Sequence, residues 1–348
     1  MRIKAGLDNS DLAAVPRRIK AIEDSGFDGV SAAENAHDPF LPLAIAAVNS
    51  TRVTLETGVA IAFPRSPMMS AQAAWDLQAA SNGRFVLGIG SQIKAHNERR
   101  YSTPWTAPAP RMREYINSIR AIWRTWQTGE KLDFQGEHYT FTLMTPNFSP
   151  APLECAPPAI KISAVGPNML ALAGEACDGV SLHGFCTRDY IAEQIMPNLE
   201  RGMMRTNRNR ESFEVSGGGF VATGATDEDV AKAVEWVRYR VAFYGSTRAY
   251  WPVLAQHGLE DLGHKLLDMT KAGHWDQIAA EVSDDVVRLF AAVGRHDEIK
   301  AAIDARFGGL VDAVNPTTPP SPASTLPPDL IEDLKTIGSP FEGFATAV

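Results

Sequence analysis

Residues 81–90, Ser-Asn-Gly-Arg-Phe-Val-Leu-Gly-Ile-Gly, place a turn directly before a short continuous apolar run. An apolar run bounded by turn residues is typical of a strand covered on both faces, as in a parallel sheet. Residues 67–81 before it and 110–126 after it are predicted as helices. The stretch is therefore expected to be the strand of a helix–strand–helix unit.

The same alternation extends along the chain in both directions. The predicted strands are 3–7, 30–33, 53–59, 85–89, 159–164, 179–182, 213–222 and 310–314, and further helices are predicted at 11–24, 39–49, 168–176, 190–205, 227–242 and 329–337. Parallel strands need crossover helices, and closing the sheet removes its exposed edges. The sequence therefore predicts an α/β fold, a (β/α)8 TIM barrel, with a doubly wound open sheet as the alternative.

We expect residues 1–348 to form a single domain with insertions at about 131–158 and 245–285, on the C-terminal face of the barrel. The first insertion alternates apolar and polar residues like a hairpin, and the second is predicted to be helical and contains tryptophan and histidine. Such insertions commonly build a substrate pocket, although packing of the insertion alone would also explain these residues. Residues 315–328 contain six prolines and are expected to form a surface loop.

Composition excludes several classes of protein. The 348 residues include 33 Lys and Arg against 41 Asp and Glu, a net charge of −8, which argues against nucleic acid or an anionic membrane as a partner. No apolar run approaches the ~20 residues of a membrane span. Cys155, Cys177 and Cys186 are too few for a disulfide scaffold and suit a reducing cytoplasm. We expect a cytoplasmic protein whose partner is a small-molecule substrate.

Several catalytic motifs are absent from the sequence. H-E-x-x-H, G-x-x-x-x-G-K-S/T and G-x-S-x-G do not occur, so zincin, P-loop and α/β-hydrolase chemistry lack their minimal parts. Residues 88–93 are the nearest dinucleotide fingerprint, but they lack its third glycine. The sequence therefore gives no reason to expect a metal site or a classical NAD-binding fold.

Catalytic residues of a barrel are expected just after its strands. The second predicted strand is followed by Glu34, Asn35, His37 and Asp38. Histidine exchanges protons near neutral pH, and Glu34 could tune His37 or act itself. The alternative is that His37 and Asp38 only begin the next helix.

Other strand ends supply further candidates. Gly58 and Val59 end the third strand, where a glycine allows close approach of a flat ring or marks a bulge. Ser91 follows the fourth strand and leads into the polar run 94–100, which contains His96 and is either a wall of the site or a solvated loop. His183 directly follows the sixth strand.

The end of the fifth strand, Ala164-Val165-Gly166-Pro167, places small residues before a helix. Free backbone N–H groups and the positive end of the helix dipole make this turn a candidate phosphate cradle. Residues 293–298, Val-Gly-Arg-His-Asp-Glu, are a second anion candidate, although a helix N-cap at Asp297 would also explain them.

Together these motifs resemble the bacterial-luciferase-like family of flavin and deazaflavin oxidoreductases, above all its actinobacterial branch that uses coenzyme F420. The matching pieces are 26–29, 34–40, 57–59 with 63–67, 81–90, and 164–167 with 176–179, with a weaker match at 293–298. They occur in the expected order over the first 190 residues. Their joint occurrence is more specific than any one of them.

The resemblance implies a (β/α)8 barrel with the cofactor ring at its C-terminal mouth. It also implies a non-proline cis peptide behind that ring, which here would be Gly58–Val59. Ser91 would lie beside the ring, Asn35 would be a further cofactor-binding residue, and the cradle at 164–167 would hold the phosphate. Homodimers are common in such families, so a homodimer is expected.

The chain also departs from the family pattern. Sugar-phosphate dehydrogenases of the family end strand two with an Asp-His pair and carry a glutamate after strand four. This chain has Glu34-Asn35 with His37 further on, and Ile93 near the second position. We therefore do not expect a sugar-phosphate substrate.

The resemblance implies an oxidoreductase that moves a hydride between a small organic substrate and C5 of F420. His37 is the leading proton-transfer candidate, Glu34 is its partner, and His96 and His183 are alternatives. The acidic tail of F420 would favour Lys94, Arg99 or Arg100 near the mouth. The alternatives are an FMN-dependent monooxygenase and a barrel that binds ligand without catalysis.

Overall fold

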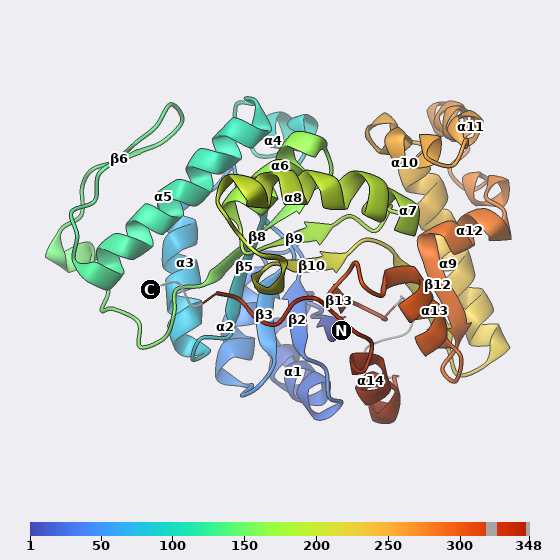
Figure 1. Ribbon diagram of the computed structural model, residues 1–348, viewed down its shortest axis with the longest axis horizontal. Helices are drawn as coiled ribbons and strands as arrows, with labels where there is room; N and C mark the ends of the chain where they lie inside the picture. The colour runs from blue at the N-terminus through green and yellow to red at the C-terminus, as the bar shows by residue number, and fades with distance from the viewer. Residues whose placement is uncertain (318–325, 346–348) are drawn as a thin grey trace. The chain divides into compact units, whose positions relative to one another are not determined.

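A computed structural model describes residues 1–317 and 326–345. Its parallel strands form one sheet in the order β3-β2-β1-β13-β10-β9-β8-β5-β4, and a further pairing of β3 with β5 closes the ring (Figure 1). The predicted (β/α)8 TIM barrel is confirmed. Part of the proline-rich loop predicted at 315–328, residues 318–325, lies outside the described residues.

The strands of the barrel agree closely with the predicted runs. They are β1 (Arg2–Gly6), β2 (Gly29–Ala32), β3 (Thr54–Thr57), β5 (Phe85–Gly90), β8 (Ala159–Ala164), β9 (Gly179–Leu182), β10 (Glu214–Gly217) and β13 (Ala313–Val314). The short strand β4 (Ala60–Ile61) pairs with β5 beyond the point where β3 ends. The hairpin predicted in the first insertion is present as the antiparallel pair β6 (Phe134–Gln135) and β7 (Thr140–Phe141).

Helices follow the strands as the alternation predicts. They are α1 (Val15–Asp24), α2 (Phe40–Val48), α3 (Pro67–Ala80), α4 (Lys94–Arg99), α5 (Pro108–Thr128), α6 (Pro167–Ala176), α7 (Arg188–Tyr190), α8 (Met196–Arg205), α9 (Asp227–Gly245), α10 (Trp251–Ala255), α11 (Glu260–Lys271), α12 (Asp284–Phe290), α13 (Ile299–Phe307) and α14 (Pro328–Lys335). A π-helical turn at Ile191–Ile195 joins α7 to α8. The polar run after the fourth predicted strand therefore contains a helix, α4.

Three predicted strands are wrong in their extent. Of the run predicted at 310–314, only Ala313–Val314 forms a strand, β13. The run predicted at 53–59 ends as β3 at Thr57, and β4 resumes at Ala60. The run predicted at 213–222 is two strands, because Gly217 and Gly218 both have φ of 82° and turn the chain out of the barrel. The second of them, β11 (Phe220–Gly224), pairs in parallel with β12 (Ala291–Arg295), which the sequence reading missed.

The backbone pairing of β3 with β5 covers Leu55 and Glu56, and the Thr57 side chain extends the contact beyond it. The Thr57 hydroxyl donates to the Gly88 carbonyl oxygen at 2.6 Å and accepts the Gly88 N–H at 2.9 Å. A Cβ atom on Gly88 would overlap the Thr57 carbonyl oxygen, so only glycine allows this approach. The close contact fixes the level at which β3 ends.

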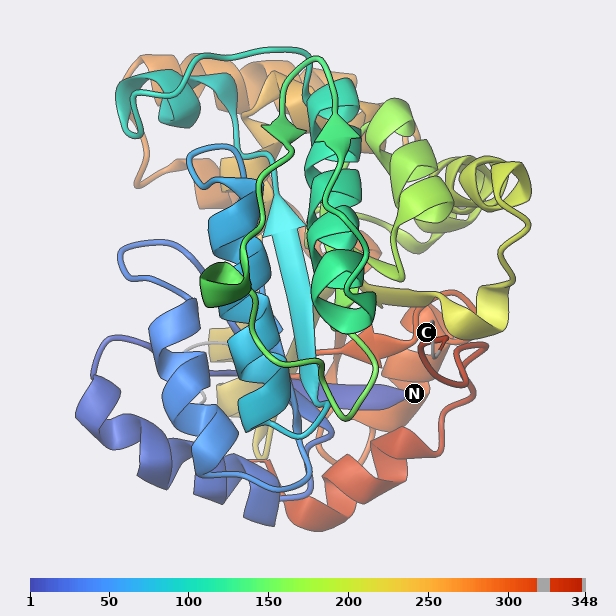
Figure 2. The same cartoon turned by 90° about the vertical axis from the view of Figure 1, so that its left-hand side faces the viewer.

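The chain divides into two compact units, each described by itself. The first unit comprises Gly6–Ser181, Asn198–Glu214 and Phe341–Val348. In it α3 and α5 cover β5 (Figure 2). The Trp75 ring meets the Trp126 ring edge-on, with the ring centroids 5.4 Å apart. The Trp123 indole donates to the Ala71 carbonyl oxygen at 3.1 Å, so this large ring is buried without an unpaired donor.

The second unit comprises Met1–Ala5, Leu182–Pro197 and Val215–Pro340. Its apolar cluster lies among α9, α12 and the β11–β12 pair, with Phe185 stacked on Phe290 at 4.4 Å. The region 245–285 is helical, as predicted, and contains α10 and α11.

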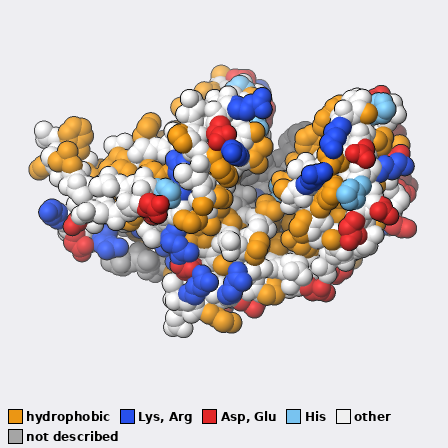
Figure 3. Space-filling view, turned by 90° about the horizontal axis from the view of Figure 1, so that it is seen from above, with side chains coloured by type: hydrophobic (Ala, Val, Ile, Leu, Met, Phe, Trp, Pro, Cys, Tyr) orange, Lys and Arg blue, Asp and Glu red, His pale blue; other side chains and the backbone are white. Residues whose placement is uncertain are grey.

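The surface charges, the helix lengths and the cysteines can be compared with what the composition predicts. Basic and acidic side chains are interspersed among hydrophobic ones on the face drawn in Figure 3. None of the helices described is long and apolar enough to cross a membrane. Cys155, Cys177 and Cys186 are all free, and the latter two are buried.

A charged cluster lies inside the barrel portion of the first unit. The Lys161 ammonium is fully buried and contacts Glu56 at 2.8 Å and Glu214 at 3.0 Å. The Ser181 hydroxyl donates to Glu56 at 3.4 Å. A buried charge is tolerated only when it is paired and hydrogen-bonded, so each member of this cluster depends on the others.

We expect Lys161→Met to destabilise the protein by about 3–5 kcal/mol, because it leaves two buried carboxylates without this ammonium. The measurement is urea-induced unfolding followed by circular dichroism. Lys20→Met is the matched control, since Lys20 forms only an exposed pair with Asp24, and its effect should stay within about 0.5 kcal/mol. Equal effects of the two variants would show that the buried cluster contributes nothing specific.

Candidate functional site

The candidate site is built at the carboxyl ends of β2, β3, β4, β5 and β8, all in the first unit. Glu34, two residues beyond β2, has a side chain that is only 7% exposed. Its Oε2 accepts the Ile61 N–H at 2.7 Å and an Arg65 N–H at 2.6 Å. Tyr101 donates to Oε1 at 3.4 Å. The carboxylate is therefore fixed from three directions.

Arg65 completes a clamp on the backbone of Ile61. Its Nη1 donates to the Ile61 carbonyl oxygen at 3.0 Å, while Glu34 holds the N–H of the same residue. Its Nη2 donates to Asp38 at 2.9 Å. Burial opposes the charge of Arg65, but the bonds to both carboxylates raise the pKa of Arg65 above its usual value. The pair Glu34–Arg65 thus pins β4 beside the end of β5.

The backbone between β3 and β4 contains the expected cis peptide. Gly58–Val59 is a non-proline cis bond, which confirms that part of the resemblance. Gly58 is exposed, and its Cα faces Ser31, where an added Cβ would lie 3.0 Å from the Ser31 Cβ. A Cβ on Gly90 would lie 2.9 Å from a Val59 methyl, so Val59 packs closely against the end of β5.

The segment after β5 returns across the end of β2. The half-buried Ser91 accepts a hydrogen bond through its carbonyl oxygen from the buried Asn97 side chain at 2.9 Å. Arg100, at the end of α4, donates to the Asn35 carbonyl oxygen at 2.5 Å. Asn35 itself is exposed. The Tyr101 bond to Glu34 is the second tie between these two segments.

The end of β8 has the form expected of an anion cradle. Ala164 is buried, whereas Val165, Gly166 and Pro167 are exposed. Gly166 precedes the ten-residue helix α6, and a Cβ on Gly166 would meet no atom within 4 Å. The first N–H groups of a helix have no partner within it, so this open turn can receive a phosphate.

The histidine candidates after β2 and β5 are both accessible. His37 is exposed, and His96 is half-buried on α4. Within 1–317 and 326–345, neither imidazole makes a hydrogen bond or an ion pair, and Glu34 is paired with Arg65 rather than with His37. The neighbouring Asp38 accepts the Phe40 N–H at 2.8 Å and so begins α2, as one alternative predicted.

His183 belongs to the second unit and is mostly buried among aromatic rings. Its Nδ1 accepts the Phe185 N–H at 3.0 Å. Burial lowers the pKa of His183 to about 4, so the imidazole is neutral at pH 7. This histidine does not exchange protons readily near neutral pH.

Comparison with known proteins places this geometry in a family. Residues 2–313 match the sequence model of the luciferase-like monooxygenases. The chain belongs to the luciferase-like monooxygenase family.

The chain is similar to proteins from bacteria and archaea. It is 45% identical to the uncharacterized protein Rv1360 of Mycobacterium tuberculosis, over 88% of this chain and 90% of that protein. It is 30% identical to the 5,10-methylenetetrahydromethanopterin reductase of Archaeoglobus fulgidus, over 81% of this chain and 82% of that protein. The fold is similar to that of the coenzyme F420-dependent tetrahydromethanopterin reductase of Methanopyrus kandleri, with a TM-score of 0.76, 20% identity and 97% of both chains covered.

The luciferase-like family contains both F420-dependent and FMN-dependent members. In this luciferase-like barrel Gly58 is exposed, and the space beside Gly166 is open. Arg65 and Tyr101 were missed from the sequence as site residues. Arg65 lies inside the matched stretch 63–67, which was the available signal, whereas nothing near Tyr101 indicated its role.

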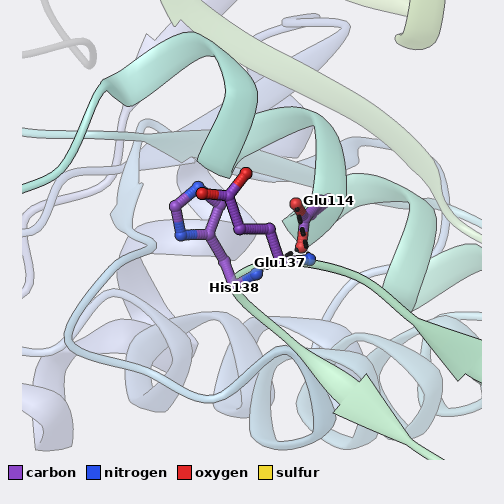
Figure 4. A group of neighbouring side chains, drawn as sticks. All are labelled: Glu114, Glu137 and His138. Carbon is purple, nitrogen blue, oxygen red and sulfur yellow. Dashed lines mark hydrogen bonds between the residues drawn. The ribbon is translucent and has the colours of Figure 1, made fainter.

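One cluster in the first unit has the composition of a metal site. Donor atoms of Glu114, Glu137 and His138 lie within 4.8 Å of one another (Figure 4). The Glu114 carboxylate, however, accepts the backbone N–H groups of Glu137 and His138 at 3.1 and 2.7 Å. Its oxygens are thus used to hold the hairpin turn against α5.

The second anion candidate has a different structure from the one predicted. Residues 291–295 form β12, and α13 begins after Glu298, so Asp297 is not the N-cap. The Arg295 guanidinium lies 3.3 Å from Asp297, and its backbone N–H donates to Glu298 at 3.4 Å. The guanidinium and the backbone N–H of Arg295 are therefore already bound to carboxylates of the same turn.

We expect Arg65→Met to destabilise this luciferase-like protein by about 3 kcal/mol, because the mostly buried Glu34 carboxylate loses its cation. Adding Glu34→Gln should recover part of that loss, since a neutral amide oxygen can still accept the Ile61 N–H. Thermal unfolding of the two single variants and the double variant measures the coupling. If the stability lost in the double variant equals the sum of the losses in Arg65→Met and Glu34→Gln, the two side chains do not act together on Ile61.

Proposed function

We propose that this protein is an F420-dependent oxidoreductase that transfers a hydride between C5 of F420 and a small organic substrate. Two similarities support the proposal: the Archaeoglobus fulgidus reductase at 30% identity and a putative coenzyme F420-dependent oxidoreductase of Mycobacterium tuberculosis at 29% identity. Both cover about four fifths of this chain. The alternative within the family is an FMN-dependent monooxygenase.

The observation that carries the choice of F420 is the charge of α4, directly after β5. Lys94 and Arg99 on α4, and Arg100 directly after it, are exposed. Of these three, Lys94 alone has an acidic partner among the described residues, Glu98 at 3.8 Å. FMN ends in a phosphate, whereas F420 continues into an acidic oligoglutamate tail. Exposed cations beside the mouth favour the longer anionic cofactor.

The open turn at Gly166 and the exposed backbone of Gly58 are the features that support a cofactor at this end of the barrel. The Val165-Gly166-Pro167 turn and the start of α6 would hold the phosphate, and the Gly58–Val59 backbone with Ser91 would flank the ring. The bound cofactor supplies the hydride chemistry. The protein's part is to position the substrate beside the ring and to handle one proton.

The proton falls to His37 and not to Glu34. Glu34 is held by Arg65, Ile61 and Tyr101, so moving a proton to it would break a charge-assisted pair. His37 is exposed five residues beyond β2 and makes no such bond within the part of the chain that the structure describes. Glu34 thus acts as a positioning residue, and His96 is the alternative proton donor.

Titration with F420 and, in parallel, with FMN tests the cofactor, with quenching of tryptophan fluorescence as the signal. We expect micromolar or tighter binding of F420 and much weaker binding of FMN. Arg99→Glu combined with Arg100→Glu should weaken F420 binding on the order of tenfold, because exposed ion pairs contribute about 0.2–1 kcal/mol each. Arg124→Glu combined with Lys131→Glu, two exposed cations at and just beyond the far end of α5, is the charge-matched control. Preference for FMN would favour the monooxygenase, and binding of neither would favour a barrel that binds ligand without catalysis.

Replacing His37 by Ala tests the proton-transfer role. Loss of a general acid or base typically lowers turnover by about 100-fold or more, whereas the Kd for F420 should change less than about twofold. The measurement is kcat and Kd for His37→Ala and His96→Ala side by side. Unchanged turnover of His37→Ala with a large loss in His96→Ala would transfer the role to His96.

A further inference from the structure

His183 lies in an aromatic group at the end of β9, within the second unit. Its ring stacks on Tyr250 at 4.5 Å with an interplanar angle of 23°, and the Tyr244 ring meets it edge-on at 4.4 Å. Phe185 packs beside both tyrosines at 5.8 and 6.3 Å and is itself stacked on Phe290. Two tyrosine rings thus contact the imidazole directly, and Phe185 supports both of them.

The hydrogen bond to Phe185 fixes which nitrogen of His183 carries the proton. Nδ1 accepts the Phe185 N–H at 3.0 Å, so in the neutral imidazole Nδ1 has no hydrogen. The proton of the neutral ring is then on Nε2. His183 is therefore a donor at Nε2 and cannot accept a hydrogen bond there.

The polar tips of this aromatic group are accessible and unused. Among the residues that the structure describes, the Nε2 of His183 and the hydroxyls of Tyr244 and Tyr250 have no hydrogen-bond partner, yet none of them is a buried unpaired atom. Each is an N–H or O–H group on the edge of a mostly buried ring. Aromatic bodies with free polar tips are typical of sites that bind a flat ligand and orient it through a few hydrogen bonds.

The chemistry of these groups indicates the class of ligand. No charged side chain forms an ion pair or a hydrogen bond with His183, Tyr244 or Tyr250 in the described ranges, so an ionic ligand would meet no opposite charge on these three residues. The Nε2–H of His183 can donate to an acceptor atom of a ligand. The aromatic rings can contact an apolar or planar part of the same ligand. A carbonyl group on a flat apolar skeleton meets both needs.

We propose that His183, Tyr244 and Tyr250 form a recognition site for a neutral carbonyl compound, with the Nε2–H of His183 donating to the carbonyl oxygen. His183 is then a hydrogen-bond donor and not the acid or base of the reaction. This assignment goes beyond the proposed function, because it holds with either F420 or FMN as the cofactor. It is testable without turnover.

Nitrogen-15 NMR of histidine-labelled protein measures the tautomer directly. His183→Gln assigns the signal by its disappearance from the spectrum. We expect Nε2 of His183 to be protonated and Nδ1 unprotonated at every pH from 5.5 to 9. A ring protonated on Nδ1, or one that titrates between pH 6 and 7, would overturn the proposal.

Ligand recognition is tested with acetophenone against ethylbenzene, which has nearly the same shape but no acceptor oxygen, and against the anion benzoate. Acetophenone should shift the Nε2–H signal of His183 in a saturable manner, with at least fivefold weaker responses to the other two. Tyr250→Leu should abolish the shift, and Tyr239→Leu, elsewhere on α9, should retain it. Equal responses to acetophenone and ethylbenzene would overturn the donor role, and so would no response in the wild-type protein.

Because Tyr250→Leu removes a packed ring, Tyr250→Phe provides a second variant that keeps the ring and removes only the hydroxyl. The His183 tautomer and the melting temperature should be unchanged in it, while the acetophenone affinity falls severalfold. These readouts do not depend on cofactor binding, so a failure of the F420 proposal and a failure of this one are distinguishable. An unchanged affinity in Tyr250→Phe would remove the hydroxyl from the site.

Discussion

The close approach of Thr57 to Gly88 is the contact on which the candidate site depends. The Thr57 hydroxyl bonds both backbone groups of Gly88, and the absence of a Cβ on Gly88 makes the approach possible. Because β3 ends there, the chain passes through Gly58–Val59 before β4 pairs with the upper part of β5. Ile61 is thereby placed where Glu34 takes its N–H and Arg65 its carbonyl oxygen. A glycine in one strand thus determines the position of an ion pair on the two neighbouring strand ends.

In this arrangement the Glu34 carboxylate is paired with Arg65 and not with His37. Glu34 and His37 are three residues apart in sequence, and a carboxylate near a histidine is commonly expected to tune it. Here the carboxylate is already bound to a cation, a backbone N–H and a phenol, and the imidazole is left exposed. The Glu34–Arg65 ion pair therefore fixes the backbone of Ile61 in β4. A change at Glu34 therefore acts first on the geometry of the mouth and only through it on any reaction.

The sequence was sufficient for the barrel but not for the partners of its side chains. Continuous apolar runs such as 85–90 predict buried strands from local composition alone, and the eight runs correspond to the eight barrel strands. The split of 213–222 was not visible, because alternative backbone angles at Gly217 and Gly218 leave the hydrophobic pattern intact. The pairing of Arg65 with Glu34 and the packing of rings around His183 could not be predicted for a different reason. Glu34 and Arg65 are 31 residues apart, and His183 and Tyr250 are 67 apart, so only the folded chain brings each pair together.

The proposed preference for F420 rests on residues at the edge of the mouth and not on those at its centre. A flat ring and a phosphate are common to F420 and FMN, so the proposed roles of Gly58, Val59, Ser91 and the turn at Gly166 do not distinguish the two cofactors. The two cofactors differ only beyond the phosphate, where F420 carries additional negative charge. The residues that can respond to that difference are exposed cations near the strand ends, and α4 supplies Arg99 and Arg100 without acidic partners among the described residues. Surface charges of this kind can vary without a change of fold, so a fold shared by F420-dependent and FMN-dependent proteins does not by itself identify the cofactor.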